Sequence, residues 1–484
     1  MKKKLDMPWL SIFLLIFIFF PIYSEDKIRN LSSKPNIIFI LVDDLGKEWL
    51  KCYGGEGIST PNIDKLALTG VKFNNVYSMP QCTPSRMCFL TGQYPYNNGW
   101  VNHWDTPRWG VAYYDWERNP CIARNIKNAG YATAVAGKWQ LNDFRVQPES
   151  LFKMGFDDYC MWTGGEGSQD AEHAKASDQR YWNPYIHTKE GSKTYKGEFG
   201  PDIYNKFILN FITKNKARPF FIYYPMTLPH MPLVHTPLDM NAKTPLEKHK
   251  AMVRYMDYLV GNVMALLEKE NLRKNTLIIW TTDNGTSGTL NNMRNGRAVQ
   301  GGKMKTTENG INAPFIVSCP GLVAEGIESN ALVDFTDMLP TFCDLAGGKL
   351  ESGYSYDGYS SVEVLFGKEM HSKRPWILAM GGQNALATDT GVKNIYKFRD
   401  RVVRDERFKI FIDSKRTVTK LVDLSKDPEE KNNLVDKPEY KGALIELSKA
   451  IENFPVQDRD PDYKNLPTNP WDEKPKASGL FVKK

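Results

Sequence analysis

The sequence predicts an α/β protein with a large, mostly parallel sheet flanked by helices and a smaller C-terminal α+β subdomain. Short apolar runs rich in β-branched and aromatic residues recur along the N-terminal two thirds and alternate with stretches of helical spacing. Polar residues directly follow several of these runs. From about Gly353 the pattern changes to short alternating segments, which indicate a small antiparallel sheet.

The expected strands of the large sheet are continuous apolar runs, because parallel strands are buried on both faces. They cover 36–42, 71–76, 131–136, 219–224, 276–281 and 313–317. Capping residues and apolar residues at helical spacing predict helices over 60–67, 122–129, 251–270 and 332–345. Residues 147–200 are polar and aromatic, and we interpret them as an insertion or long loop region that shapes a pocket.

We place a domain boundary near Gly347-Gly348. It separates a first domain, 25–348, from a C-terminal antiparallel-sheet subdomain, 349–457, and an extended or disordered tail, 458–484, rich in Pro, Asp and Lys. Within the subdomain we expect strands over 401–404 and 408–412 and a helix over 440–451.

The first 24 residues have the pattern of a secretory signal peptide. Three lysines precede a short apolar run that ends at Phe20, and the small residue Ser24 follows. We therefore expect a secreted or periplasmic protein. The run is too short to cross a bilayer comfortably, so no stable membrane span is expected; an uncleaved anchor is the alternative, because Ile22 is not the preferred small residue.

Composition describes a globular chain without a nucleic-acid footprint. The net charge of +7 is small for 484 residues and is spread along the sequence, which is compatible with anionic substrates but not with a basic patch for nucleic acid. The chain has seven cysteines; with Cys82 set aside, six could form disulfides in an oxidising compartment, and their spacing assigns none.

Oxygen ligands follow two of the predicted strands. Asp43 and Asp44 come directly after 36–42, and Asp283 and Asn284 come after 276–281. Ligands bind at the carboxyl ends of parallel strands, and adjacent carboxylates repel each other unless a cation joins them. The set holds only hard oxygen donors, so it favours Ca²⁺ or Mg²⁺ over zinc. An Asp-Asp turn or cap is the alternative for the first pair.

Three further side chains are candidates for chemistry. Cys82 precedes Pro84 and Arg86, a pattern that indicates a nucleophile at a helix start beside an anion site; a buried Cys next to an ordinary helix is the alternative. Lys138 lies in the loop expected after 131–136, at the same sheet edge as Asp43. Among the seven histidines, His230 is best placed, because it follows the strand 219–224.

The run Cys82-Thr-Pro-Ser-Arg86, followed by Leu90-Thr-Gly92, resembles the signature of the type I sulfatases of the alkaline phosphatase superfamily. The resemblance covers almost all of the expected mature chain, so 25–348 would be the catalytic domain. It implies that Cys82 is oxidised to formylglycine (3-oxoalanine) by a formylglycine-generating enzyme. The hydrated aldehyde would supply the attacking hydroxyl.

Matching motifs carry further expectations onto this chain. The resemblance implies that Asp43, Asp44, Asp283 and Asn284 bind one Ca²⁺ together with the modified Cys82, with Mg²⁺ as the less favoured metal. It also implies that four residues hold the sulfate and the leaving oxygen: Arg86, Lys138 of Gly-Lys-Trp, His230 of His-x-Pro and Lys303 of Gly-Gly-Lys. In the implied mechanism His230 or Lys303 protonates the departing alcohol. The tail motif of the family matches 421–434.

One position departs from the family pattern. Gln140 stands where the family has His after Gly-Lys-Trp, and that His takes a proton from the second hydroxyl of the formylglycine hydrate. Gln cannot do this by titration. His103 is a candidate substitute, with a core or pocket-lining role as the alternative; we assign Gln140 and His103 to substrate binding.

The resemblance predicts a sulfuric ester hydrolase, and the aromatic insertion favours a sulfated carbohydrate. Flat aromatic faces stack on sugar rings, and basic side chains pair with further sulfates. The candidates are Trp104, Trp109, Trp162, Trp182 and Tyr185 for stacking, and Arg108, Arg180 and Lys193 for sulfates, although half of the aromatics could be core. The alternatives are a phosphodiester or phosphonate monoester hydrolase of the same superfamily and, because of Gln140, a sugar-binding pseudoenzyme.

Overall fold

A computed structural model describes residues 34–100, 113–142, 144, 147–162, 180–382, 385–388 and 391–462. The signal peptide expected over 1–24, His103, Trp104, Arg108 and Trp109 lie outside these residues. No helix in the described part is long and apolar enough to cross a membrane. The described residues form one compact unit, and the division predicted near residue 348 stays a prediction.

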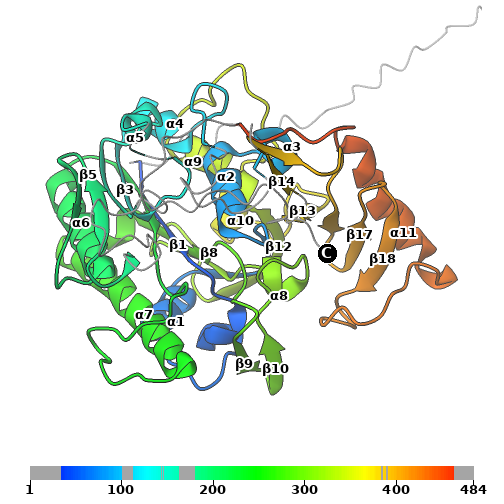
Figure 1. Cartoon of the computed structure of the whole chain (residues 1–484), viewed down its shortest axis with the longest axis horizontal. Helices are drawn as coiled ribbons and strands as arrows, with labels where there is room; N and C mark the ends of the chain where they lie inside the picture. Colours follow the sequence, from blue (N-terminus) through cyan, green and yellow to red (C-terminus); the bar gives the residue numbers. More distant parts are fainter. Residues whose placement is uncertain are drawn as a thin grey trace, which may run out of the picture. The chain divides into compact units, whose positions relative to one another are not determined.

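Within the described residues, ten strands form one mixed, largely parallel sheet in the order β12-β2-β11-β8-β1-β7-β3-β4-β5-β6 (Figure 1). Its centre, β8-β1-β7-β3-β4, is parallel throughout, and β11, β5 and β6 run antiparallel to their neighbours. The strands are β1 (Asn36–Val42), β2 (Val71–Tyr77), β3 (Ala132–Lys138), β4 (Asp158–Trp162), β5 (Tyr185–Thr188), β6 (Gly191–Thr194), β7 (Phe220–Pro225), β8 (Thr276–Thr282), β11 (Phe315–Ser318) and β12 (Ile327–Asp334).

Helices cover both faces of this sheet, because side chains of a buried strand alternate between two apolar layers. On one face Ile38 and Ile40 of β1 belong to a core cluster with residues of α1, α6 and α7. On the other face Phe39 stacks on Phe89 of α2 at 4.1 Å and meets Phe342 of α9 edge-on. The helices are α1 (Pro61–Leu68), α2 (Cys82–Thr91), α3 (Pro95–Asn98), α4 (Ile122–Asn128), α5 (Ser150–Lys153), α6 (Gly200–Asn215), α7 (Pro245–Lys269), α8 (Glu308–Ile311), α9 (Met338–Leu345), α10 (Val362–Leu365) and α11 (Lys441–Ser448).

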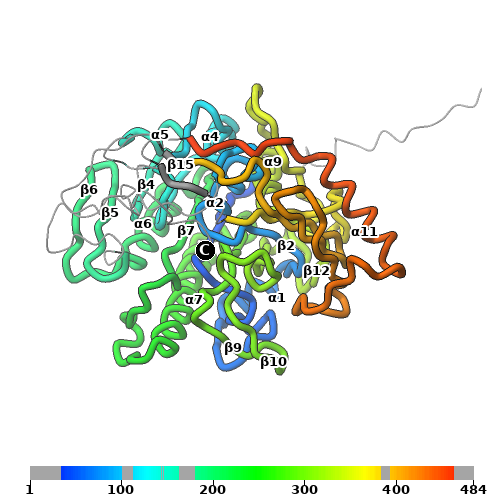
Figure 2. The backbone as a smooth tube through the Cα atoms, turned by 45° about the vertical axis from the view of Figure 1, so that its right-hand side comes forward, coloured from blue at the N-terminus to red at the C-terminus, as the bar shows by residue number. Residues whose placement is uncertain are grey.

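A four-stranded antiparallel sheet makes the C-terminal part, in the order β13-β16-β17-β18, with α11 packed on β17. Figure 2 shows this part beside β2 and β12 of the large sheet, and β13 contacts both strands. The remaining strands form two hairpins, β9–β10 and β14–β15. The bounds are β9 (Asn291–Arg294), β10 (Arg297–Gln300), β13 (Ile377–Met380), β14 (Ala385–Thr388), β15 (Gly391–Asn394), β16 (Arg401–Arg404), β17 (Phe408–Ile412) and β18 (Val418–Asp423).

Two predicted segments are corrected. The interpretation of 147–200 as an insertion or loop is wrong for its described ends, because β4 extends the parallel sheet and β5 and β6 continue it. The helix predicted over 332–345 begins only at Met338. Residues 327–334 pair with β2 as β12, and the Asp334 carboxylate accepts a hydrogen bond from the backbone N–H of Thr336, which starts a short 3-10 turn before α9.

Other boundaries shift by a few residues. The strand predicted over 131–136 continues to Lys138, so this lysine ends β3 and does not lie in a loop. The helix predicted over 251–270 begins at Pro245, because Thr244 and Glu247 form a reciprocal capping box. The terminal helix ends at Ser448 and continues as a 3-10 turn.

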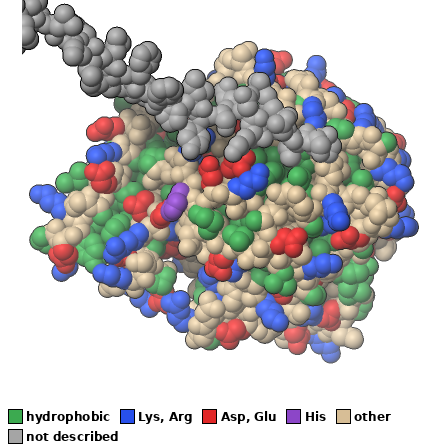
Figure 3. Space-filling view, turned by 180° about the vertical axis from the view of Figure 1, so that it is seen from behind, with side chains coloured by type: hydrophobic (Ala, Val, Ile, Leu, Met, Phe, Trp, Pro, Cys, Tyr) green, Lys and Arg blue, Asp and Glu red, His purple; other side chains and the backbone are tan. Residues whose placement is uncertain are grey.

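The start of the predicted tail is held in place. Asp458 is buried, and its carboxylate accepts hydrogen bonds from the Arg401 guanidinium at 2.8 Å and from the Arg399 backbone N–H at 2.8 Å. The rest of the tail, 463–484, lies outside the described residues. Lysines, arginines and acidic side chains intermingle on the face shown in Figure 3, in line with the modest net charge.

Candidate active site

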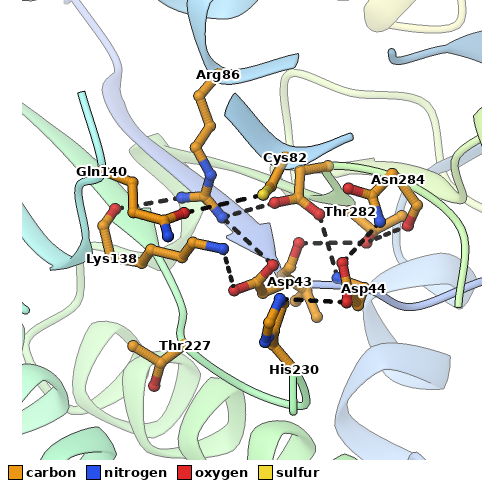
Figure 4. A network of polar contacts seen from close by, with 12 residues as sticks. Asp43, Asp44, Cys82, Arg86, Lys138, Gln140, Thr227, His230, Thr282 and Asn284 are labelled. Atoms are coloured by element: carbon orange, nitrogen blue, oxygen red, sulfur yellow. Dashed lines mark hydrogen bonds and ion pairs between the residues drawn. The ribbon is translucent and has the colours of Figure 1, made fainter. Parts of the chain in front are cut away.

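The carboxyl ends of neighbouring strands bring the predicted oxygen ligands together (Figure 4). Asp43 and Asp44 follow β1, and Asp283 and Asn284 follow the adjacent strand β8. All four are buried. Thr282, the last residue of β8, accepts a hydrogen bond from the Leu45 backbone N–H at 3.1 Å, which ties the two strand ends together.

Asp44 is the centre of these contacts and has an unusual backbone, with φ of 66° in the left-handed region. Its backbone N–H donates to Asp283 Oδ1 at 3.1 Å. Its side chain accepts from Asn284 Nδ2 at 2.7 Å and from Lys303 Nζ at 2.7 Å. A non-glycine residue held in this region by its surroundings is a frequent mark of a functional site.

Cys82 is the first residue of α2, as the sequence predicts, and is 1% exposed. Its Sγ lies 3.9 Å from Gln140 Oε1 and points at the carboxylates in Figure 4. The side chain of Ser85 fixes the turn before the helix: it accepts from the Met79 backbone N–H at 2.9 Å and donates to the Asp283 carbonyl at 2.5 Å. The nucleophile candidate is thus anchored to the end of β8.

The residues fit a divalent cation. Possible ligand atoms of Asp43, Cys82 and Asp283 lie within 4.8 Å of one another, and so do those of Asp43, Asp44 and His230. Asp43 Oδ1 and Asn284 Oδ1 are buried, and neither has a hydrogen-bond partner among the described residues. An unpaired buried oxygen is costly, and a cation would satisfy both. Carboxylate and amide oxygens are the ligands that Ca²⁺ and Mg²⁺ prefer.

The electrostatics indicate the same need for positive charge. Burial raises the pKa of Asp283 well above its ordinary value, with the neighbouring Asp43 charge adding to the effect. Burial likewise raises the pKa of Asp44. Burial also opposes ionisation of Asp43, but the charges of Lys138, His230, Arg86 and Arg180 together outweigh it and hold the pKa of that carboxyl well below its usual range. Two of the three carboxyl groups are therefore short of counter-charge.

Buried cations line the other side of this cluster. Arg86 is fully buried and donates to Asp283 Oδ2 at 2.6 Å and to the Lys138 carbonyl at 3.2 Å. Lys138 is also fully buried, and its Nζ donates to Asp43 Oδ2 at 2.8 Å. Because the guanidinium and the ammonium converge on the two strand ends, they can hold an anion there.

His230 and Lys303 form the more open edge of the site. Each side chain is 18% exposed, and Lys303 Nζ lies 3.1 Å from His230 Nε2. Burial, followed by the Lys303 charge, lowers the pKa of His230 well below its ordinary value. Burial opposes the charge of Lys303, but Asp44, Cys82 and Asp43 together outweigh it and raise the pKa of the ammonium. In this arrangement Lys303 holds the proton and the neutral imidazole accepts from it.

Ten of the eleven predicted site residues share this contact network, and His103 lies outside the described residues. Their roles stay predictions. The ten are Asp43, Asp44, Cys82, Arg86, Lys138, Gln140, His230, Asp283, Asn284 and Lys303.

The structure corrects part of the predicted sugar surface. Trp162 and Tyr185 are buried, so they cannot offer stacking faces, whereas Trp182 is partly exposed. Arg180 is 4% exposed, lies 4.1 Å from the Trp162 ring centre and contacts His230 Nδ1. It therefore positions His230 and does not reach out to distant sulfates. Sequence reasoning missed this role and the anchoring by Ser85 and Thr282, because no spacing pattern links these residues to the site.

Comparison with known proteins agrees with this geometry. A family model described as Sulfatase matches residues 35–348, and a model described as N-sulphoglucosamine sulphohydrolase, C-terminal, matches residues 302–457. The chain is 30% identical to an N-acetylgalactosamine-6-O-sulfatase of Bacteroides thetaiotaomicron, over 88% of this chain and 95% of that protein. It is 27% identical to an ulvan-active sulfatase of Formosa agariphila, over 88% and 81% of the two chains.

A solved structure has the same fold. The crystal structure of a protein called Ps i-CgsB superposes with a TM-score of 0.74 at 26% identity, covering 90% of this chain and 95% of that one. That protein has also been solved in complex with k-i-k-neocarrahexaose.

Proposed function

The chain belongs to the sulfatase family, and on that premise we propose that it hydrolyses a sulfate ester carried by a carbohydrate, with Cys82 as the precursor of the nucleophile. As a member of this family it is a sulfuric ester hydrolase. The observation that carries the finer proposal is the convergence of the buried Cys82, three buried carboxyl groups and the cations Arg86, Lys138 and Lys303 on one sheet edge.

Five residues would hold the cofactors. Asp43, Asp44, Asp283 and Asn284 would bind Ca²⁺ together with Cys82 after its conversion to formylglycine by a formylglycine-generating enzyme. When present, the metal would supply Lewis-acid polarisation and the converted side chain a hydroxyl nucleophile. Asp43 Oδ1 and Asn284 Oδ1 support the metal, because neither accepts a hydrogen bond from any described residue.

The residues of the chain have distinct tasks in this proposal. Arg86 and Lys138 bind and orient the sulfate group beside Cys82, and their burial strengthens their attraction for the anion. Lys303 holds a proton at Nζ, 3.1 Å from His230 Nε2, where it can pass to the departing alcohol oxygen directly or through the imidazole. Arg180 fixes the ring of His230. Gln140 contributes a hydrogen bond near Cys82 but cannot titrate.

A carbohydrate substrate is supported by the relatives and by one aromatic side chain. Two of the proteins similar to this chain are an N-acetylgalactosamine-6-O-sulfatase and an ulvan-active sulfatase, and a similar structure holds a neocarrahexaose. Trp182 is partly exposed, and its ring lies 5.4 Å from that of His235, not far along the chain from His230. Such a face suits stacking against a sugar ring. We also propose secretion or periplasmic export, on the N-terminal pattern of residues 1–24.

The test is a paired experiment on the purified chain, produced with and without a formylglycine-generating enzyme. Mass spectrometry of the Cys82 peptide should detect the aldehyde in the first preparation only. That preparation should hydrolyse a sulfated mono- or oligosaccharide with a higher kcat/KM than an aryl sulfate or an aryl phosphodiester. A higher kcat/KM for the aryl phosphodiester than for the sulfate esters would favour the phosphodiesterase alternative. An unmodified Cys82 in the first preparation would favour the sugar-binding pseudoenzyme.

A further inference from the structure

A second pocket lies apart from the catalytic residues. It has a volume of about 780 Å³, within the range of ligand sites, and none of the ten site residues lines it. Its walls come from residues 46–48 after β1, the hairpin β9–β10, the loop before α8 with α8 itself, and residues 424–431 after β18, together with Asn74, Asn75, Glu328 and Arg404. The pocket is connected to the site through the chain, because Gly46 and Lys305 lie two residues beyond Asp44 and Lys303.

The acidic side chains in the wall already have partners. Glu308 pairs with Arg404 at 2.9 Å and with Lys409 at 3.1 Å, and Glu430 pairs with Lys409 at 2.7 Å. Glu429 pairs with Lys431, and Glu328 pairs with Lys72 at 3.0 Å. The last acid of the wall, Glu48, is buried against the Thr286 hydroxyl, and burial raises its pKa.

Four basic side chains in the wall form no ion pair within the described part of the chain: Lys47, Arg294, Arg297 and Lys305. Among the described residues, Arg294 donates only to the Tyr53 carbonyl, at 2.8 Å, and Arg297 and Lys305 are exposed. The pocket therefore carries an excess of positive charge, which its own acids do not balance.

Lys47 gives the strongest sign of an anion site. It is 7% exposed, and two of its three ammonium hydrogens are used, by the Asn74 carbonyl at 2.7 Å and by Asn312 Oδ1 at 2.7 Å. Burial lowers its pKa and the nearby Arg294 charge adds to the effect, which the Glu308 carboxylate opposes only in part. A buried ammonium held by neutral acceptors is costly unless an anion pairs with it.

We propose that this pocket binds an anionic group of a sulfated saccharide chain, at a sugar other than the one whose ester is cleaved. The inference rests on the proposed function, because a polyanionic substrate has further sulfate or carboxylate groups that need counter-charge. Lys47 and Arg294 form the inner seat, and Arg297 and Lys305 form the rim that attracts the chain.

The test uses the double variant Arg297→Gln/Lys305→Gln. Both residues are exposed, so the fold should tolerate the change. The matched control is Lys206→Gln/Arg218→Gln, which removes one exposed lysine and one exposed arginine from the region of α6, away from the pocket. Isothermal titration at 0.15 M salt measures binding of a sulfated hexasaccharide and of its desulfated form. Hydrolysis of an aryl sulfate is measured in parallel.

We expect the pocket variant to bind the sulfated hexasaccharide roughly three- to tenfold more weakly, the effect of losing two exposed ionic contacts. The control variant, the desulfated form and the aryl sulfate should show no change. An equal loss in the control, or no loss in the pocket variant, overturns the inference. Binding of sodium sulfate is titrated as well. If the pocket variant loses sulfate binding to the same extent as hexasaccharide binding, the inference is overturned in favour of a site for free inorganic sulfate.

These outcomes separate the pocket from the proposed function. Titration needs no turnover, so a failure to hydrolyse any sulfated sugar would refute the proposed substrate while the binding measurement still decides on the pocket. Conversely, hydrolysis of a sulfated sugar with unchanged hexasaccharide binding in the variant would refute the pocket and leave the proposed function standing.

Discussion

Replacing His249 by Phe should make the protein more resistant to acid. His249 lies in α7, is 1% exposed and meets the Trp49 ring edge-on at 4.3 Å. Neither ring nitrogen has a hydrogen-bond partner among the described residues. Burial lowers the pKa of His249 from 6.5 to about 3. The imidazole therefore stays neutral in the folded protein at pH values where the unfolded chain takes up a proton.

The sign and size of the effect follow from this shift. Because the folded pKa is depressed, the stabilising contribution of His249 is complete above pH 6.5 and is lost as the pH falls toward 3. At pH 4.5 the solution is about two pH units below the pKa of the unfolded imidazole. The free energy of unfolding is therefore about 2.5 kcal/mol lower than at neutral pH. Phe removes this titration and keeps an aromatic edge against Trp49.

The assay is thermal unfolding of wild type and His249→Phe at pH 7.5 and pH 4.5, followed by tryptophan fluorescence at constant calcium. A chain of 484 residues has an unfolding entropy of about 1 kcal/mol/K. The drop in Tm from pH 7.5 to pH 4.5 should therefore be about 2 to 3 °C smaller in the variant than in wild type. Other titrating groups cancel in the comparison. The control is His371→Phe, whose side chain is 79% exposed. If Tm of His249→Phe at pH 4.5 falls as far from its value at pH 7.5 as that of wild type, the reasoning is refuted.

Three further results are expected at the active site. Cys82→Ala should lower kcat by roughly a thousandfold or more without changing Tm by more than a few degrees. Cys52→Ala, which removes a half-buried thiol outside the site, should keep its activity. Turnover of Cys82→Ala within tenfold of wild type would exclude the nucleophile assignment. Chelation should abolish activity, and Ca²⁺ should restore it; recovery with Zn²⁺ alone would contradict the oxygen ligand set. Gln140→His should raise kcat roughly tenfold at neutral pH, because φ of 58° suits His and the imidazole can accept a proton; an unchanged pH profile would count against this role.

The sequence predicted the centre of the fold because parallel strands buried on both faces leave an unmistakable apolar run. Runs 36–42 and 276–281 became β1 and β8, and their adjacency placed Asp43 and Asp283 together. Runs that are short or pair at an edge were not recognised. β4 has only five residues, and β12 alternates irregularly because its pairing with β2 shifts between Ser329 and Leu332.

The parts of the site that escaped prediction depend on contacts distant in sequence. Arg180 contacts His230, which is 50 residues away in the sequence, and no local sequence pattern predicts such a contact. Asp44 shows the opposite case: its left-handed backbone is held by neighbours 240 residues away, yet the Asp-Asp pair after a buried strand already predicted a metal site at this position. The second pocket joins segments that are distant in the sequence, and their charges look ordinary until their ion pairs are known.

The burial of Cys82 limits when its chemistry can be installed. Only 1% of the residue is exposed, and the segment bearing Asp283, which holds Ser85, leaves the ribosome some 200 residues later. Under the proposed conversion, an enzyme that oxidises the Cys82 side chain therefore has to reach it while this part of the chain is still unfolded. Maturation and folding compete for the same interval, so slower synthesis between Cys82 and Asp283 would raise the modified fraction, and rapid refolding of an unmodified chain would trap it as an inactive protein.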